Sequence, residues 1–169
     1  INACLEYFNV PTVTEWYERY EGAPRLAAFR TSAVFTSAEG AVLAWLRKGE
    51  IDAAKIVCEE WDRERFSKAL PSIRALTRTK NPSKFIPQLE SICAECGVAV
   101  VIAKAPAGCR ASGATRFIAS NKALVMLSFR YLSDDHFWFT FFHEAGHLIL
   151  HDTSALFLEG SDFCSGNEE

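Results

Sequence analysis

A short apolar segment near the end of the chain carries three of the protein's four histidines. Residues 141–151 read FFHEAGHLILH. His143 and His147 are four residues apart, so on a helix their side chains project side by side, about 40° apart around the axis. Two imidazoles in that arrangement can bind one tetrahedral metal ion. The spacing therefore predicts a helix that carries a metal site.

Glu144 is the one carboxylate of this segment. On a helix it lies about 60° from His147, where it can reach a water molecule on the metal. His-Glu-x-x-His on a helix is typical of zinc metalloproteases, in which the glutamate takes a proton from the attacking water. We therefore expect His143 and His147 to be metal ligands and Glu144 to be the catalytic base.

Two further residues of the segment call for an interpretation. Three ligands spaced by four residues would span about 12 Å of helix, and Zn–N bonds are about 2 Å long, so His151 is not expected to share the metal. Glycine inside a helix lowers its stability by about 1 kcal/mol relative to alanine. A glycine at position 146 therefore indicates that a strand or a substrate approaches the helix closely there. The helix is apolar nearly all round, so we expect it to be buried.

A catalytic zinc site needs one more protein ligand, because such sites usually have three and keep one open position. The carboxylates downstream of the histidines are Asp152, Glu159, Asp162, Glu168 and Glu169. Asp152 is too close along the helix, whereas Glu159 and Asp162 are expected in a Gly/Ser-rich loop. Two histidines and one carboxylate suit Zn²⁺, and also Mn²⁺ or Fe²⁺.

Hydrophobic periodicity and capping residues predict the helices around this segment. The expected helices are residues 14–20, 36–49, 50–61, 62–77, 82–96 and 133–152. Thr36 opens a capping-box pattern, Gly49 is expected to end the second helix, and Pro71 is expected to kink the fourth or to start a new one. Asn81 and Pro82 are suited to begin a helix, and they mark a boundary between residues 1–80 and 81–169.

The expected strands lie between the last two helices. Residues 98–102 are a short β-branched apolar run, typical of a buried strand. Residues 115–119 and 124–128 alternate and flank a turn, which predicts a hairpin, and residues 105–113 are expected to be a loop. The order is helices, then helix–strand–strand–strand–helix, so we expect an α+β fold.

Composition bounds the class of protein. The chain has 169 residues, 49% of them hydrophobic, a net charge of −3 and a pI near 5.9. It can bury a core, but it has no basic surface for nucleic acid and no apolar run long enough to cross a membrane. The six cysteines form no repeating framework, so we expect free thiols and a cytoplasmic location.

Cys93 and Cys96 form a Cys-x-x-Cys pair. Such a pair can be half of a zinc site or a redox pair. No second ligand pair with similar spacing exists, and the motif closes a helix instead of opening one. We therefore expect two small buried residues at the end of a helix.

The segment DDHFWFTFFHEAGHLILH, preceded by SGATRF and ALVMLSFRYL, resembles the ImmA/IrrE family of metallopeptidases. Upstream, AFRTS, AWLRKGE and LPSIRALT resemble the connecting region of family members that carry an N-terminal helix-turn-helix. The likeness covers most of the chain and is strongest over residues 112–151.

This resemblance implies a helical connecting segment at 1–80 and a small zincin-like domain at 81–169. Such a domain has a short sheet, an active-site helix and a further helix that supplies a glutamate ligand. The expected activity is that of a zinc endopeptidase that cleaves a repressor or regulatory protein, in transcriptional, stress or toxin–antitoxin control. DNA is expected only through a helix-turn-helix that precedes Ile1.

The resemblance also suggests where the site is completed. Glu169 is the nearest match to the family's glutamate ligand, followed by Glu168, and a residue beyond the end of the chain remains an alternative. Zincins hold the substrate as a strand added to a sheet edge, for which Gly113, Ala114 and Thr115 are the expected positions. Two other hypotheses remain open: a metal-binding regulatory module that does not cleave its partner, and a helical interaction domain with a chance motif.

Overall fold

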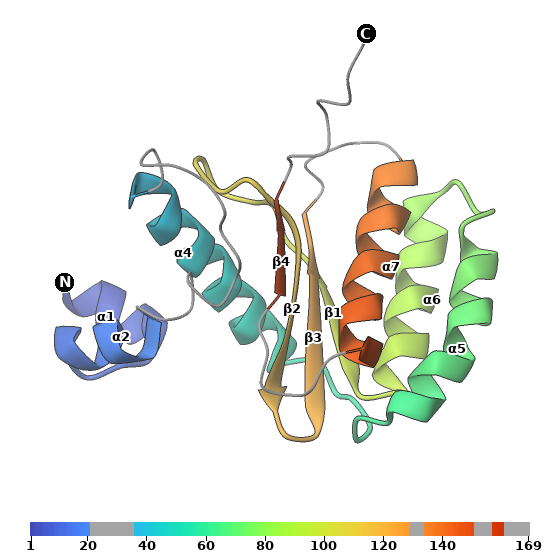
Figure 1. The fold of residues 1–169 in the computed structure, drawn as a ribbon, viewed down its shortest axis with the longest axis horizontal. Helices are drawn as coiled ribbons and strands as arrows, with labels where there is room; N and C mark the ends of the chain where they lie inside the picture. Colours follow the sequence, from blue (N-terminus) through green and yellow to red (C-terminus); the bar gives the residue numbers. More distant parts are fainter. Residues whose placement is uncertain (21–35, 129–133, 151–156, 161–169) are drawn as a thin grey trace, which may run out of the picture.

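The structure is a computed structural model that describes residues 1–20, 36–128, 134–150 and 157–160. The helix of residues 36–53 packs on one face of a central sheet, and the helices of residues 63–76, 82–94 and 134–150 lie on the side of the other face (Figure 1). The helices are α1 (Asn2–Phe8), α2 (Val13–Tyr20), α4 (Thr36–Ala53), α5 (Arg63–Leu76), α6 (Pro82–Ala94) and α7 (Asp134–Leu150). The strands are β1 (Val98–Ile102), β2 (Ala111–Ala119), β3 (Lys122–Leu127) and β4 (Phe157–Gly160). The predicted α+β class is confirmed.

The sheet has the strand order β1-β3-β2-β4. β1 pairs with β3 in parallel, and β2 is antiparallel to both of its neighbours, β3 and β4. The predicted β2–β3 hairpin is therefore confirmed, although β2 begins at Ala111, inside the segment that was expected to be a loop. β4 was not predicted, because the strand has only four residues and its neighbours in the sequence are mostly polar or small residues. In the described part of the chain, no helix has the length and apolar character needed to cross a membrane.

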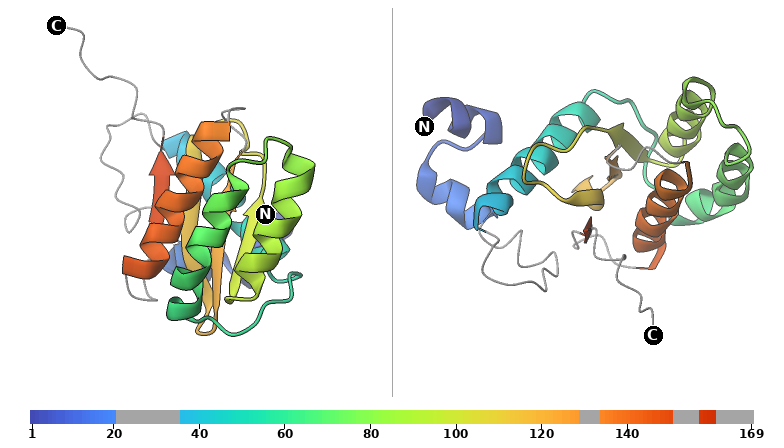
Figure 2. Two further views of the ribbon diagram at one scale, coloured as in Figure 1. Left: turned by 90° about the vertical axis from the view of Figure 1, so that its right-hand side faces the viewer. Right: turned by 90° about the horizontal axis from the view of Figure 1, so that it is seen from above.

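The central strands are buried on both faces, which explains their continuous apolar sequence. Alternate residues of β1 and β3, such as Val100 and Val125, pack toward α5, α6 and α7. The residues between them, such as Val101 and Met126, pack toward α4. Figure 2 shows these layers from above, with α4 on one side of the strands and the other three helices opposite.

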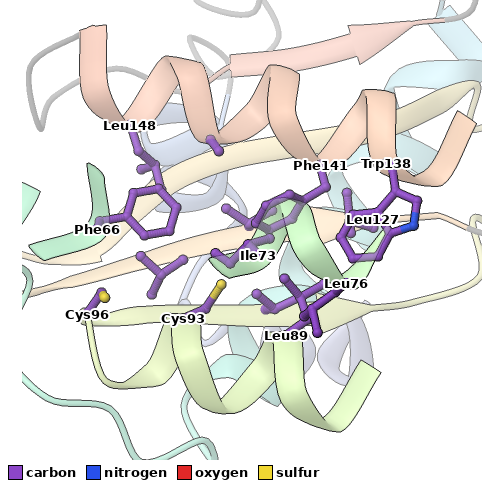
Figure 3. Close-up of a cluster of buried hydrophobic side chains, with 14 of the residues drawn as sticks. Phe66, Ile73, Leu76, Leu89, Cys93, Cys96, Leu127, Trp138, Phe141 and Leu148 are labelled. Carbon is purple, nitrogen blue, oxygen red and sulfur yellow. The ribbon is translucent and has the colours of Figure 1, made fainter. Parts of the chain in front are cut away.

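The larger core lies between the sheet and α5, α6 and α7. Phe141 and Leu148 of α7 pack in one cluster with Phe66 of α5 and Leu89 of α6 (Figure 3). Phe66, Phe141 and Leu89 are each 0% exposed. Because these side chains leave water completely, they fix how α7 is rotated about its own axis.

The prediction of two helices that meet at Gly49 is wrong. α4 runs without a break from Thr36 to Ala53, and residues 54–62 are not helical. A Cβ at Gly49 would lie 2.0 Å from the sulfur of Met126. The glycine therefore provides room for Met126 of β3, and this packing outweighs its low helix propensity.

The predicted start of α6 at Asn81 and Pro82 is confirmed, and the structure adds a cap at the start of α5 that was not predicted. Asp62 accepts a hydrogen bond from the Arg65 backbone N–H at 2.8 Å, and this contact lowers the pKa of the Asp62 carboxyl below its usual value. Asn81 accepts one from the Ser83 N–H at 3.0 Å, ahead of Pro82. Pro71 lies inside a single continuous α5 and does not start a new helix.

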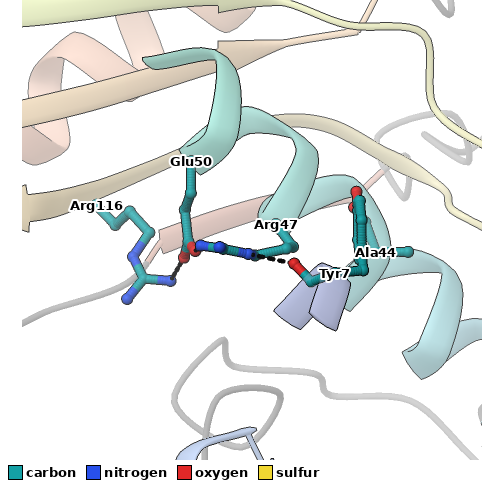
Figure 4. A network of polar contacts seen from close by, with 5 residues as sticks. All are labelled: Tyr7, Ala44, Arg47, Glu50 and Arg116. Atoms are coloured by element: carbon teal, nitrogen blue, oxygen red, sulfur yellow. Dashed lines mark hydrogen bonds and ion pairs between the residues drawn. The ribbon is translucent and has the colours of Figure 1, made fainter. Parts of the chain in front are cut away.

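Polar contacts join α1 to α4, and α4 to the sheet (Figure 4). The Arg47 Nε donates to the Tyr7 carbonyl and its Nη1 to Glu50, each at 2.8 Å. The Tyr7 hydroxyl donates to the Ala44 carbonyl, also at 2.8 Å. Glu50 also pairs with Arg116 of β2. Elements from before residue 80 thus pack on the sheet that follows it, while the boundary at residue 80 stays a prediction.

Gly97 joins α6 to β1 at a position that only glycine fits. Its φ is +82°, and a Cβ would lie 2.3 Å from the Trp61 backbone. We expect Gly97→Ala to lower the free energy of unfolding by more than about 2 kcal/mol. Gly40→Ala, where nothing lies within 4 Å, should instead stabilise α4 by ~0.5–1 kcal/mol. Urea unfolding of both variants tests this, and equal effects would contradict it.

Candidate metal and catalytic site

Residues 143–147 lie in the second half of α7. Phe141, Ala145 and Leu148 of this helix are buried in the core. Because successive residues are about 100° apart around a helix, this burial turns His143 to the outside, where it is exposed. His147 is half-buried and Glu144 is fully buried. The packing thus leaves the two histidines on the outer side of the helix and turns Glu144 to the inner side.

The two imidazoles converge. His143 Nε2 and His147 Nε2 are 3.0 Å apart, and the ring centroids are 4.7 Å apart. Two nitrogens on one tetrahedral zinc, each bonded at about 2.0–2.1 Å, would be about 3.3 Å apart. The observed separation is close to that value, so the pair fits a shared metal ion with a small adjustment of the side chains.

Glu144 is directed to the sheet. Its side chain is 0% exposed, and its Oε2 accepts a hydrogen bond from the Thr115 hydroxyl at 2.5 Å. The Thr115 oxygen also lies 3.3 Å from the Glu144 backbone carbonyl. Burial of a carboxylate is costly, and hydrogen bonds or a nearby cation offset that cost. This contact is one such compensation.

Gly113 leaves the space that Glu144 occupies. A Cβ at position 113 would lie 2.7 Å from Glu144 Oε1 and 2.6 Å from Thr140 Cγ2. The sequence predicted close approach at Gly113, and the groups that approach are those of α7. Ala114, the next residue, packs instead in the core on the α4 side of the sheet. Two of the three positions predicted to bind substrate, Gly113 and Thr115, therefore surround Glu144.

β2 is not a sheet edge in this structure. β4 pairs with it in an antiparallel register that places Gly113 opposite Glu159 and Thr115 opposite Phe157. The expectation of an edge at residues 113–115 is therefore corrected, because the four residues of β4 occupy it. Glu159, which was expected in a loop, is part of that strand.

The third metal ligand is not found among the described residues. No group of three or more His, Cys, Asp or Glu side chains that could hold a metal forms in the ranges that the structure covers. The predicted candidates Asp152, Asp162, Glu168 and Glu169 lie outside those ranges, as does His151. Their roles stay predictions.

The expectation that α7 is buried all round is wrong, since Phe139 is 58% exposed and Leu150 is 77% exposed. Among the described residues, a Cβ at Gly146 would meet nothing within 4 Å outside its own helix. No described strand therefore approaches Gly146, and the approach of a substrate there stays a prediction. The Phe139 ring instead stacks on His143, with centroids 6.1 Å apart and planes at 25°. The apolar pattern thus marks a helix with one buried side and one open side.

Cys93 and Cys96 are both buried in the main core, at the end of α6 and just after it. Burial raises the pKa of the Cys93 thiol and that of the Cys96 thiol. A raised pKa disfavours the thiolate, which is the nucleophilic form of cysteine. These observations support the structural interpretation of the pair.

Comparisons with protein-family models, with curated proteins and with solved structures find no match for this chain. The functional interpretation of α7 therefore depends on the positions of His143, Glu144 and His147 and on the resemblance of its sequence.

Gly113 and Gly146 form a matched pair for testing this geometry. Gly113→Ala would place a methyl group against Glu144 and Thr140, so we expect it to lower the free energy of unfolding by about 1–3 kcal/mol. The methyl group of Gly146→Ala meets nothing within 4 Å in the described part of the chain, so this variant should raise that free energy by about 1 kcal/mol through helix propensity. Thermal and urea unfolding measure both effects. A Gly113→Ala variant as stable as the parent protein would contradict the close contact.

Proposed function

We propose that the protein is a zinc-dependent endopeptidase of the ImmA/IrrE type that cleaves a repressor or other regulatory protein. The observation that carries this proposal is the convergence of two imidazole nitrogens, 3.0 Å apart on α7, beside a buried glutamate. The sequence around α7, which resembles that family, supports the same activity. Zn²⁺ is the proposed ion, and Mn²⁺ and Fe²⁺ suit the same donors.

Each residue of the motif has a separate role in this proposal. His143 and His147 would hold the ion through their Nε2 atoms, with Glu169, Glu168 or a later residue as third ligand. A bound zinc ion supplies a Lewis acid that polarises the scissile carbonyl. Glu144 takes a proton from the attacking water and passes it to the leaving amine.

The substrate is proposed to bind as an added strand at the end of the sheet next to α7. β4 is the last strand on that side of the sheet order. An extended peptide would therefore align along β4, or take its place along Gly113, Ala114 and Thr115 of β2. Both arrangements use the main-chain hydrogen bonds of strand addition.

A second candidate function is a metal-binding regulatory module that does not cleave its partner. The complete burial of Glu144 and its hydrogen bond from Thr115 favour this candidate, because both also suit a purely structural carboxylate. The proposed setting is the same for both functions: the cytoplasm, a protein partner, and DNA only through a preceding helix-turn-helix.

Zinc analysis with three substitutions separates the two functions. We expect the full-length protein to bind about one zinc ion per chain. His147→Ala should lose the ion, whereas His136→Ala should keep it, since His136 lies on α7 outside the motif. Glu144→Gln should keep the ion and lose cleavage of a co-expressed partner or of a proteome-derived peptide library.

The outcomes have distinct meanings. Zinc bound without any cleavage by the parent protein would favour the regulatory module. Equal zinc content in the His147→Ala and His136→Ala variants would overturn the metal site and with it both functions. Full cleavage by Glu144→Gln would overturn the role of Glu144 as base.

A further inference from the structure

Thr115 lies where β2 faces the middle of α7. It is 2% exposed, and its hydroxyl donates to Glu144 Oε2 at 2.5 Å. A buried hydroxyl needs a partner, and here the partner is the carboxylate that carries the proposed chemistry. The sequence pointed to Thr115 only as a place for substrate.

We propose that Thr115 is a positioning residue that holds the Glu144 carboxylate in one orientation relative to His143 and His147. This inference rests on the proposed function, in which Glu144 transfers protons. A general base must be held at hydrogen-bond distance from the atom that it deprotonates. Thr115 performs this task from the sheet, through its hydrogen bond to the carboxylate.

The position of the Thr115 hydroxyl is itself fixed. Its backbone pairs with Val125 of β3 on one side and with Phe157 of β4 on the other, so the strand cannot shift toward either neighbour. Threonine is β-branched and therefore stiff at its first side-chain torsion. A hydroxyl held in this way donates its hydrogen bond to the carboxylate from a fixed position.

The neighbours of Thr115 on β2 strengthen this arrangement. Gly113, two residues earlier on the same face of the strand, leaves room for the carboxylate, since a Cβ there would come within 2.7 Å of it. Arg116, the next residue, pairs with Glu50 of α4 and ties the strand to the opposite layer. β2 is thus anchored on both faces where it holds Glu144.

Three substitutions test the proposal in the full-length protein. Thr115→Val keeps the shape and removes the hydroxyl, whereas Thr115→Ser keeps the hydroxyl and removes the methyl group. Thr140→Val is the matched control, because Thr140 is a buried threonine of α7 beside the same glycine and makes no side-chain hydrogen bond to a described residue. Zinc content and melting temperature are measured for each variant.

The first measurement does not depend on proteolytic activity. In the zinc-free protein, the ¹³C signal of the Glu144 carboxyl, assigned by its loss in Glu144→Gln, should move in Thr115→Val. It should stay in place in Thr115→Ser and in Thr140→Val. An unmoved signal in Thr115→Val would overturn the hydrogen bond and the proposal. If Thr115→Val does not fold, the same signal in Thr115→Ala decides.

The second readout is kinetic, on a peptide that the parent protein cleaves from the peptide library. We expect Thr115→Val to lower kcat roughly ten- to hundredfold with KM and zinc content unchanged, and Thr115→Ser to restore most of it. Cleavage by the parent protein with an unchanged kcat in Thr115→Val would overturn the positioning role. No cleavage by the parent protein would instead overturn the proposed function, and the carboxyl signal would still decide whether Thr115 holds Glu144.

Discussion

Burial of one side of α7 against the sheet fixes the geometry of the whole candidate site. Phe141, Ala145 and Leu148 enter the core, and a helix has no freedom to turn about its axis once such side chains are packed. The rotation that they impose brings the nitrogens of His143 and His147 together on the outer side. It also directs the residue between them, Glu144, into the interface with β2. Packing alone thus places two imidazoles on the outer side of α7 and a carboxylate on the side that faces β2.

β2 is the element that connects this helix to the rest of the molecule. Side chains alternate along a strand, so Gly113 and Thr115 meet α7 while Ala114 and Arg116 lie on the side of α4. Arg116 pairs with Glu50 of α4, Glu50 pairs with Arg47, and Arg47 donates to the Tyr7 carbonyl of α1. A chain of partly exposed charged groups thus connects α1 and α4 to the strand next to Glu144.

The sequence was sufficient wherever a feature depends on near neighbours. Asn81 caps its helix from two residues away, and β1 was predicted from the β-branched and apolar residues of the strand itself. The sequence was not sufficient where a residue far away in the chain determines the local structure. Gly49 stands against Met126 and does not end a helix, and β4 exists because it pairs with β2. The hydrogen bond of Thr115 with Glu144 joins two residues that are 29 positions apart in the chain, and no local sequence pattern predicts that pairing.

The most direct measurement of the central claim is X-ray absorption at the zinc edge of the full-length protein. The site described above predicts a zinc ion with two imidazole ligands at about 2.0 Å and oxygen in its remaining positions. This signature should vanish from a variant that lacks His143. Zinc surrounded by sulfur at about 2.3 Å, as binding by Cys93 and Cys96 would give, would contradict the assignment of the site to α7.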